Sequence, residues 1–259
     1  MVLTPLISAR WGARKRLAVL TDHFAIVERQ GGIVTVEPES WEELVNLSGI
    51  REGFHATLDS PAWLMRDGFL TISLWDGPRR SFMLTFCFGF DDAVPTAFIG
   101  GSQGVTTGDG GQLYKALTKA AFGLRPRDLA VELLRDVCEA MGIRRILAVS
   151  DAARHHHSAY SRFWIGTDPV KGSYDAAWID RGGTLRADGF FDLPLATPRR
   201  TREELPANKR TMYMARYQML DTIRAAVGES LAAPAQRITQ RNRGVPARPE
   251  ATGLERAPS

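Results

Sequence analysis

The chain is poor in cysteine, in long apolar runs and in net charge, and each shortage excludes a class of protein. Its 259 residues hold two cysteines, Cys87 and Cys138, too few for the disulfide framework of a small secreted domain. No apolar stretch approaches the roughly 20 residues of a membrane-spanning helix. Arginines and a lysine interrupt residues 1–20, which therefore lack the apolar core of a signal peptide. We therefore expect a soluble, cytoplasmic protein without a transmembrane segment.

The net charge of +4 is unevenly spread along the chain. Residues 231–259 contain five arginines against two glutamates, and so carry three of the four net charges. Four prolines and a shortage of core-forming residues make this stretch typical of a disordered basic tail. The body, residues 1–230, is nearly neutral, and we expect it to form a single domain. Because the excess charge lies in the tail, the composition does not favour nucleic-acid binding by the folded body.

The periodicity of apolar residues predicts a mixed α/β fold. A hairpin signal, Asp76-Gly77-Pro78, joins the first two predicted strands. Two helices between the third and fourth strands predict a crossover, which favours parallel pairing. The outcome is a mixed sheet flanked by helices, with a helical segment at the N-terminus. Helices are predicted over residues 11–30, 38–47, 112–121, 127–141 and 210–227, and strands over 69–75, 81–90, 96–99, 146–149 and 190–195.

Two segments could bind an anion. The glycine-rich segment 100–111 lies between a predicted strand and a predicted helix, where loop amides can hold a phosphate. It matches none of the named phosphate loops, so an ordinary turn is an equal alternative. Gln103 and Gly104 lie where such a loop would begin. Arg125 and Arg127 stand at the start of the next helix and offer a second anion site, with a solvated arginine pair as the alternative.

Three consecutive histidines, His155 to His157, follow the strand predicted over 146–149. Three neighbours on one helix or strand cannot all face one ion, and no cysteine or glutamate accompanies them at ligand spacing. We therefore expect no metal site. His155 lies just past the carboxyl end of the strand, where sites of open α/β sheets gather, and is a candidate catalytic residue.

Aromatic and charged residues recur between residues 174 and 217. Such side chains fit either a half-buried brace or the wall of a ligand site, and the sequence leaves both open. The candidates are Tyr174, Asp175 and Trp178 on a predicted loop, and Arg210, Arg216 and Tyr217 on the last predicted helix.

Short motifs follow one another in a fixed order along the chain. They are Arg16-Leu17, His23-Phe24, Ile99-Gly100, Gln103-Gly104, Leu117-Thr118-Lys119, Gly123-Leu124-Arg125-Pro126, Val149-Ser150, Tyr174-Asp175, Trp178, Gly182-Gly183, Phe191, Leu193-Pro194, Lys209-Arg210, Tyr213 and Arg216-Tyr217. In this order, the motifs resemble the VirK/YbjX family of bacterial proteins over about residues 14–225. The resemblance implies a link to virulence and to tolerance of antimicrobial peptides, without an agreed biochemical activity.

The order of strand, glycine segment, helix and strand also resembles the acyl-CoA-binding core of the GNAT-type acyltransferases. There, loop amides hold the pyrophosphate, and a tyrosine after the next strand can protonate the leaving thiolate. The likeness implies a donor such as acyl-CoA or another acyl thioester, bound by Gln103, Gly104, Arg125 and Arg127, with Tyr160 or His155 as proton carrier.

A different class of function stays open at this point. The chain could be a non-catalytic binding factor in envelope stress, with the aromatic and basic residues of segment 174–217 contacting a small molecule or a peptide. The sequence does not decide whether the protein is an enzyme, and it does not indicate the oligomeric state.

Overall fold

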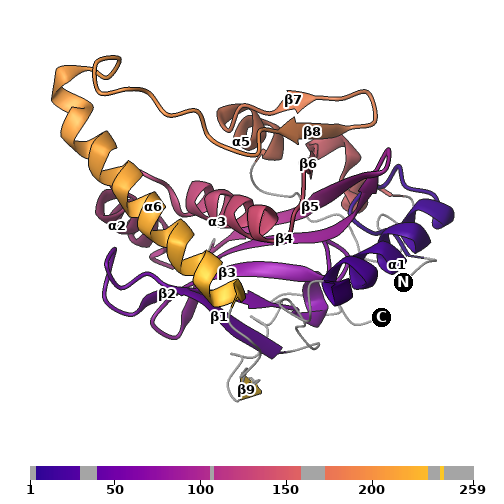
Figure 1. The fold of residues 1–259 in the computed structure, drawn as a ribbon. Coiled ribbons are helices and arrows are strands. Elements are labelled where there is room, and N and C mark those ends of the chain that lie inside the picture. The colour runs from indigo at the N-terminus through magenta and orange to yellow at the C-terminus, as the bar shows by residue number, and fades with distance from the viewer. Residues whose placement is uncertain (1–3, 30–39, 106–107, 159–172, 233–239, 242–259) are drawn as a thin grey trace, which may run out of the picture.

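The computed structural model describes residues 4–29, 40–105, 108–158, 173–232 and 240–241, and shows one curved mixed sheet packed with helices (Figure 1). The sheet order is β7-β8-β6-β5-β4-β3-β2-β1-β9. Its strands are β1 (Ser40–Asn46), β2 (Phe54–Asp59), β3 (Leu70–Asp76), β4 (Arg79–Asp91), β5 (Val94–Gly104), β6 (Arg145–Val149), β7 (Thr184–Leu185), β8 (Phe190–Leu193) and β9 (Gln240–Arg241). The helices are α1 (Ala13–Arg29), α2 (Gly110–Ala120), α3 (Pro126–Ala140), α5 (Tyr174–Asp180) and α6 (Arg210–Ala232).

The predicted class is confirmed: a mixed α/β fold with flanking helices and a helix near the N-terminus. Strands β1 to β5 pair antiparallel in chain order. The hairpin between β3 and β4 turns at Gly77, whose φ of +57° suits glycine. Strand β4 lies between β3 and β5, and Phe86 and Phe88 are fully buried, as the sequence predicted for a central strand.

Helices α2 and α3 form the predicted crossover from β5 to β6, which are parallel. Pro126 opens α3, where its missing N–H costs no helical hydrogen bond, and Gly142 follows the helix with a φ of +66°. Strand β6 then pairs antiparallel with β8. Among the described strands, β5 and β6 are therefore the one parallel pair.

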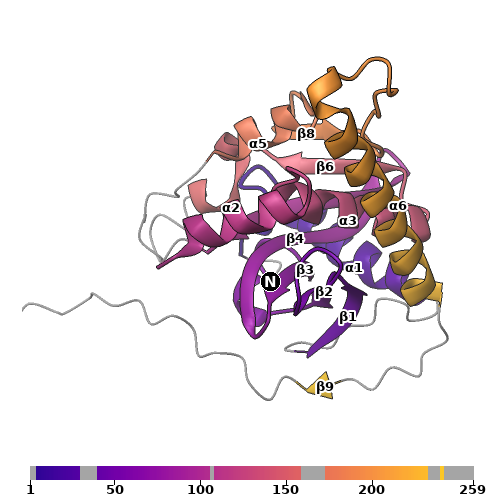
Figure 2. The same ribbon diagram turned by 90° about the vertical axis from the view of Figure 1, so that its left-hand side faces the viewer.

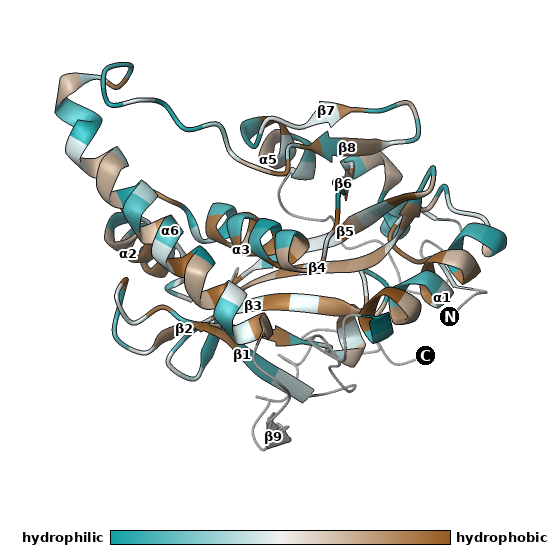
Figure 3. Cartoon of the chain, viewed as in Figure 1, coloured by the Kyte–Doolittle hydropathy of each residue, from teal (hydrophilic) through white to brown (hydrophobic). Residues whose placement is uncertain are grey.

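The helices cover both faces of the sheet. A Cβ on Gly89 of β4 would contact Val19 of α1, whereas a Cβ on Gly104 would meet Tyr114 of α2 and Phe82 of β4. Gly89 and Phe82 are an odd number of positions apart on one strand, so α1 and α2 lie on opposite faces. Helix α6 packs along α3 and reaches β1 (Figure 2). The strands are mainly hydrophobic, while α3 and α6 carry hydrophilic residues on outer turns (Figure 3).

The helix predicted over 38–47 is wrong for the residues the structure describes, because residues 40–46 form β1. They pair with β2, and the pairing shifts between Glu43 and Val45, which leaves Leu44 as an extra residue in a β-bulge. The bulge buries Leu44 and Val45 together. Trp41, Leu44 and Val45 therefore stand at the i, i+3, i+4 spacing of a helix although they belong to a strand.

Two predicted loops are also regular structure. Residues 100–104 extend β5 and pair with β4, so the glycine segment does not leave the sheet at Gly100. Residues 174–180 form α5, in which the Ser173 hydroxyl accepts a hydrogen bond from the Ala176 N–H as an N-terminal cap. Most of the predicted tail, 231–259, lies outside the described residues. Within the described part, none of the helices is long and apolar enough to cross a bilayer.

Candidate functional site

The two parallel strands separate at one point. Their pairing runs from Thr96 to Ile99 on β5, and beyond it β6 ends at Val149 while β5 continues beside β4. Thr85 pairs with Gly101 and Phe86 pairs with Ile99, so Gly100 is the extra residue of a bulge that bends β5. Because sites in α/β sheets gather at the carboxyl ends of parallel strands, this separation is the candidate site.

A buried carboxylate and a buried imidazole face each other beside the bulge. Asp67 Oδ1 lies 3.0 Å from His155 Nε2, and the two side chains are 6% and 5% exposed. Asp67 can approach because the strand carries glycines here. A Cβ on Gly100 would lie 2.2 Å from the Asp67 carbonyl oxygen, and one on Gly101 would lie 2.8 Å from Asp67 Cβ. These two glycines thus leave room for a carboxylate of the chain itself.

The histidines are held from the other side by the N-terminal segment that precedes α1. The backbone N–H of His155 donates a hydrogen bond of 2.9 Å to the Ile7 carbonyl, and Ser8 forms an isolated antiparallel β-bridge with Arg154. The His156 ring packs on His155 with 3.9 Å between ring centres. Burial, followed by the nearby His155, lowers the pKa of His156 to about 4, so its imidazole is neutral at physiological pH.

Helix α5 brings a tyrosine to the same place. The Tyr174 hydroxyl accepts a hydrogen bond of 2.7 Å from the Ser102 N–H, and the Arg154 guanidinium lies 3.8 Å from the centre of the Tyr174 ring. Burial raises the pKa of Tyr174 to about 12, so the hydroxyl keeps its proton at neutral pH. A protonated phenol at the separation can donate a proton to a group that develops negative charge there.

The other predicted members of α5 also face inward. Trp178 is fully buried, and its indole N–H donates to the Val149 carbonyl at 2.9 Å. Asp175 accepts a hydrogen bond from the Asp151 N–H at 2.7 Å. Tyr174 thus hydrogen-bonds a backbone group of β5, and Trp178 hydrogen-bonds a backbone group of β6. Helix α5 therefore lines the separation.

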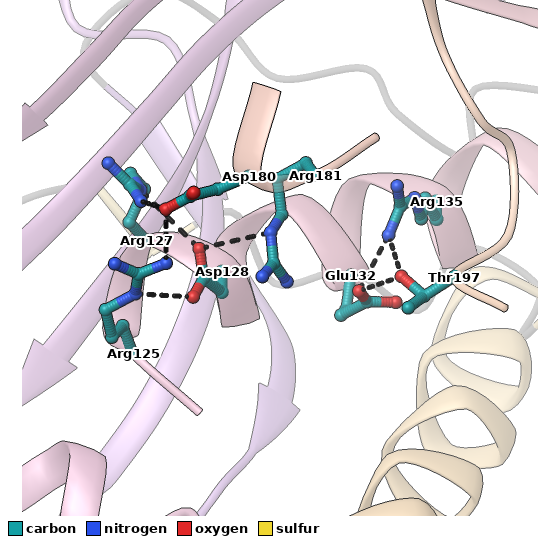
Figure 4. A network of polar contacts seen from close by, with 8 residues as sticks. All are labelled: Arg125, Arg127, Asp128, Glu132, Arg135, Asp180, Arg181 and Thr197. Atoms are coloured by element: carbon teal, nitrogen blue, oxygen red, sulfur yellow. Dashed lines mark hydrogen bonds and ion pairs between the residues drawn. The ribbon is translucent and has the colours of Figure 1, made fainter. Parts of the chain in front are cut away.

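The two predicted anion-binding arginines lie at the far end of α5, at the start of α3 (Figure 4). Arg125 donates to Asp128 at 2.8 Å and to Asp180 at 2.9 Å, and those carboxylates raise its pKa. Arg127 lies 3.5 Å from both acids. Both arginines border a cavity of about 700 Å³ whose wall is mainly apolar and whose other cations are Lys115 and Lys119.

Gln103 and Gly104 do not reach that cavity as a loop, because they pair with Met83 and Phe82 inside the sheet. The absent side chain of Gly104 leaves room for Tyr114, since a Cβ there would lie 2.2 Å from the Tyr114 hydroxyl. Tyr160 lies outside the described residues. Among the predicted site residues, His155, Tyr174, Asp175 and Trp178 are therefore the ones gathered at the strand separation.

Arg210, Arg216 and Tyr217 lie apart from this group, on α6. Arg216 donates twice to the Phe122 carbonyl, at 2.9 and 2.6 Å, and Arg210 donates to a backbone carbonyl five residues earlier. The Tyr217 hydroxyl accepts from the Arg200 N–H at 3.2 Å. These contacts fasten α6 to the turn between α2 and α3 and to the preceding loop.

Sequence reasoning missed Asp67 and assigned no role to Arg154. Asp67 lies 88 positions before its histidine partner, and no spacing rule connects the two. One local signal was present: Asp67 precedes Gly68, which has a φ of +156° and on which a Cβ would lie 2.4 Å from the Phe86 carbonyl oxygen. A glycine just before a predicted strand thus marked a close backbone approach.

The fold and the site define an α/β protein with a buried Asp–His–Tyr cluster where its parallel strands separate. The chain belongs to the family described as "Protein of unknown function (DUF535)", which it matches over residues 1–229. It is 26% identical over 227 residues to an "Uncharacterized protein" of Haemophilus influenzae, covering 87% of this chain and 73% of the relative. It is also 26% identical to "Uncharacterized protein YbjX" of Escherichia coli, covering 85% and 67%, which confirms the predicted family.

A further relative carries a more specific name. "Membrane protein LapB" of Mannheimia haemolytica is 28% identical over 144 residues, which cover 55% of this chain and 61% of that protein. No solved structure matches the chain.

Proposed function

We propose that the chain is an acyltransferase that takes its acyl group from a thioester such as acyl-CoA. The observation that carries the proposal is the point where β5 and β6 stop pairing, with a buried, protonated tyrosine, Tyr174, beside it. An acyl-CoA cleft of the GNAT type lies where adjacent parallel strands cease to pair, and here the pairing ends because β6 stops at Val149. The order of strand, glycine segment, helix and strand, which resembles the acyl-CoA-binding core of the GNAT-type acyltransferases, supports the same proposal.

Tyr174 is better placed than His155 to carry the proton. Both side chains are buried, but His155 Nε2 already faces the Asp67 carboxylate. The Tyr174 hydroxyl, by contrast, accepts one hydrogen bond and keeps its own proton up to a pKa of about 12. In the proposed step the acceptor's nucleophile forms a bond to the acyl carbon, the carbon–sulfur bond breaks, and the leaving thiolate takes the Tyr174 proton. The proton that the nucleophile loses returns to the Tyr174 oxygen, so the tyrosine ends the step protonated.

The donor's phosphates would bind at Arg125 and Arg127. The two side chains stand at the N-terminus of α3, where the helix dipole also favours an anion, and beside the cavity of about 700 Å³. The seven residues of α5 span about 10 Å and connect Tyr174, at the strand separation, with Asp180, at the arginines. One elongated ligand with an anionic end and a thioester end suits this arrangement.

A thermal-shift measurement with coenzyme A and acetyl-CoA tests the proposal. Ligand that binds the folded state raises the melting temperature by mass action, so we expect a rise at millimolar ligand. Arg127→Ala should remove most of this rise. Arg144→Ala, which changes an exposed arginine in the turn between α3 and β6, is the matched control and should keep it. No rise in the wild-type protein, or an equal rise in Arg127→Ala, contradicts the proposal.

A second candidate is a non-catalytic factor that acts at the cell envelope. The similarity to a protein named as a membrane protein favours it, as does the family resemblance to proteins linked to peptide tolerance and virulence. Fractionation of cells separates the candidates. An acyltransferase of the cytoplasm would stay in the supernatant after the membranes are pelleted, whereas the envelope factor would pellet with them.

A further inference from the structure

Three potential metal ligands from two distant segments meet beside the strand separation. Asp67 offers a carboxylate oxygen, and His155 and His156 each offer a ring nitrogen. The three ligand atoms all lie within 4.8 Å of one another. We propose that Asp67, His155 and His156 bind one divalent transition-metal ion of the zinc class.

The spacing suits such an ion. Zinc binds histidine nitrogen and carboxylate oxygen at about 2.0–2.2 Å, which places two ligand atoms on one ion about 3.0–3.5 Å apart. Asp67 Oδ1 and His155 Nε2 are already 3.0 Å apart. His156 is partly exposed, so its ring can make the small adjustment that closes the third bond.

The chemistry of the three groups selects the class of metal. Two imidazoles and one carboxylate suit zinc and its neighbours, whereas magnesium and calcium prefer oxygen ligands throughout. The buried His156 Nδ1 has no hydrogen-bond partner among the described residues.

The protein holds two of the ligands in advance. Gly100 and Gly101 let Asp67 approach the strand, and the Ile7 carbonyl fixes the His155 backbone. His156 lies at the solvent side, which gives an ion a way in. The sequence predicted no metal site because three adjacent histidines on one element cannot all face one ion. That argument still excludes one ion bound by His155, His156 and His157 together. The missing ligand comes from the turn before β3.

Titration calorimetry with zinc chloride tests the site, using the full chain without an affinity tag. We expect one equivalent of zinc to bind wild-type protein, and magnesium chloride to give no heat of binding. His156→Ala should weaken zinc binding by roughly tenfold or more. His157→Ala is the matched control, since His157 is the exposed next residue of the run and lies outside the cluster, and it should bind as wild type.

Three results would overturn the proposal. They are no zinc binding in the wild-type protein, unchanged binding in His156→Ala, and an equal loss in His157→Ala, which would assign the zinc to the exposed histidines. Cobalt substitution gives a second readout, because the visible absorption of bound Co²⁺ reports its ligands. The spectrum should change in His156→Ala and in Asp67→Asn but not in His157→Ala. An unchanged spectrum in both cluster variants would also overturn it.

The metal site and the acyltransferase proposal are independent. The metal site needs no coenzyme A, and the proposed proton transfer uses Tyr174, which is not among the three ligands. Zinc binding without any response to coenzyme A would leave the metal site standing and remove the acyltransferase. A response to coenzyme A without zinc binding would support the acyltransferase and remove the metal site.

Discussion

The hydroxyl of Tyr174 lies 2.7 Å from the backbone nitrogen of Ser102, just past the point where β5 has parted from β6. This backbone N–H lies in a partly buried part of the sheet, and the neighbouring strand that would normally supply its acceptor has ended. On the other strand, the Trp178 indole N–H donates a hydrogen bond to the Val149 carbonyl. Helix α5 is therefore what allows the two parallel strands to separate without leaving their polar groups unpaired.

Removing the Tyr174 hydroxyl should destabilise the fold. Tyr174→Phe leaves the Ser102 N–H without this acceptor, and losing such a partly buried hydrogen bond costs about 0.5–1.5 kcal/mol of unfolding free energy. Urea denaturation measures the change. Tyr213→Phe removes a partly exposed hydroxyl on α6 and should change the unfolding free energy by less than about 0.5 kcal/mol. Equal effects of the two variants would show that the Tyr174 contact does not support the separation.

A methyl group at Gly101 should also destabilise the protein. Its Cβ would lie 2.8 Å from Asp67 Cβ, so either the carboxylate or β5 must move. We expect Gly101→Ala to cost about 1–3 kcal/mol, the range for overpacking a core. Gly228→Ala is the control: nothing lies within 4 Å of its Cβ, and alanine in α6 should add up to about 1 kcal/mol of stability. Thermal or urea unfolding gives the sign of each change, and a neutral Gly101→Ala would contradict the close approach.

Much of this fold could be predicted from the sequence where local pattern and tertiary structure agree. Phe82 to Phe90 alternate along a central strand, Pro126 and Gly142 mark the limits of α3, and both signals proved right. Strand β1 could not be predicted in this way. Its bulge places apolar residues at helical spacing, and only pairing with β2 decides between helix and strand.

The site was harder to predict, because its partners are far apart in the chain. His155 follows the end of a parallel strand, as the sequence predicted, but Asp67 shares no motif with it. The glycines at 100 and 101 suggested a phosphate loop, whereas they make room for Asp67 within β5. Glycine content alone does not show which group approaches the backbone. The acidic and aromatic cluster after Ser173 carried a helix-capping signal that a loop assignment overlooked.

The stability of the protein should fall in mild acid because of His23. Burial lowers the pKa of His23 to about 4 from 6.5, and its Nδ1 accepts a hydrogen bond from the Phe88 N–H at 3.2 Å. The unfolded chain thus binds this proton at higher pH than the folded one. Folding free energy is lost as the pH falls from about 6.5 to about 4, by up to about 3 kcal/mol.

Urea unfolding at a series of pH values checks this prediction. His23→Asn keeps a hydrogen-bond acceptor but cannot titrate, so its unfolding free energy should fall less over the same range. His157→Asn, at an exposed position, should follow the wild-type curve. Equal slopes for wild type and His23→Asn would mean that His23 does not contribute to this pH dependence.

Asp180 should compete with the proposed donor for the arginines. Its carboxylate is half exposed and pairs with Arg125 and Arg127, where the phosphates would bind. Asp180→Asn should therefore tighten coenzyme A binding about two- to fivefold, in line with the small free energy of an exposed ion pair. Asp92→Asn, in the turn between β4 and β5, removes an exposed acid elsewhere and is the control. Titration calorimetry measures both, and weaker binding to Asp180→Asn would contradict the assignment.

The position of bound coenzyme A in a crystal of the full chain tests the central claim most directly. The proposal places the phosphates at Arg125 and Arg127 and the sulfur beside the Tyr174 hydroxyl, between β5 and β6. Coenzyme A bound at a different surface would contradict it.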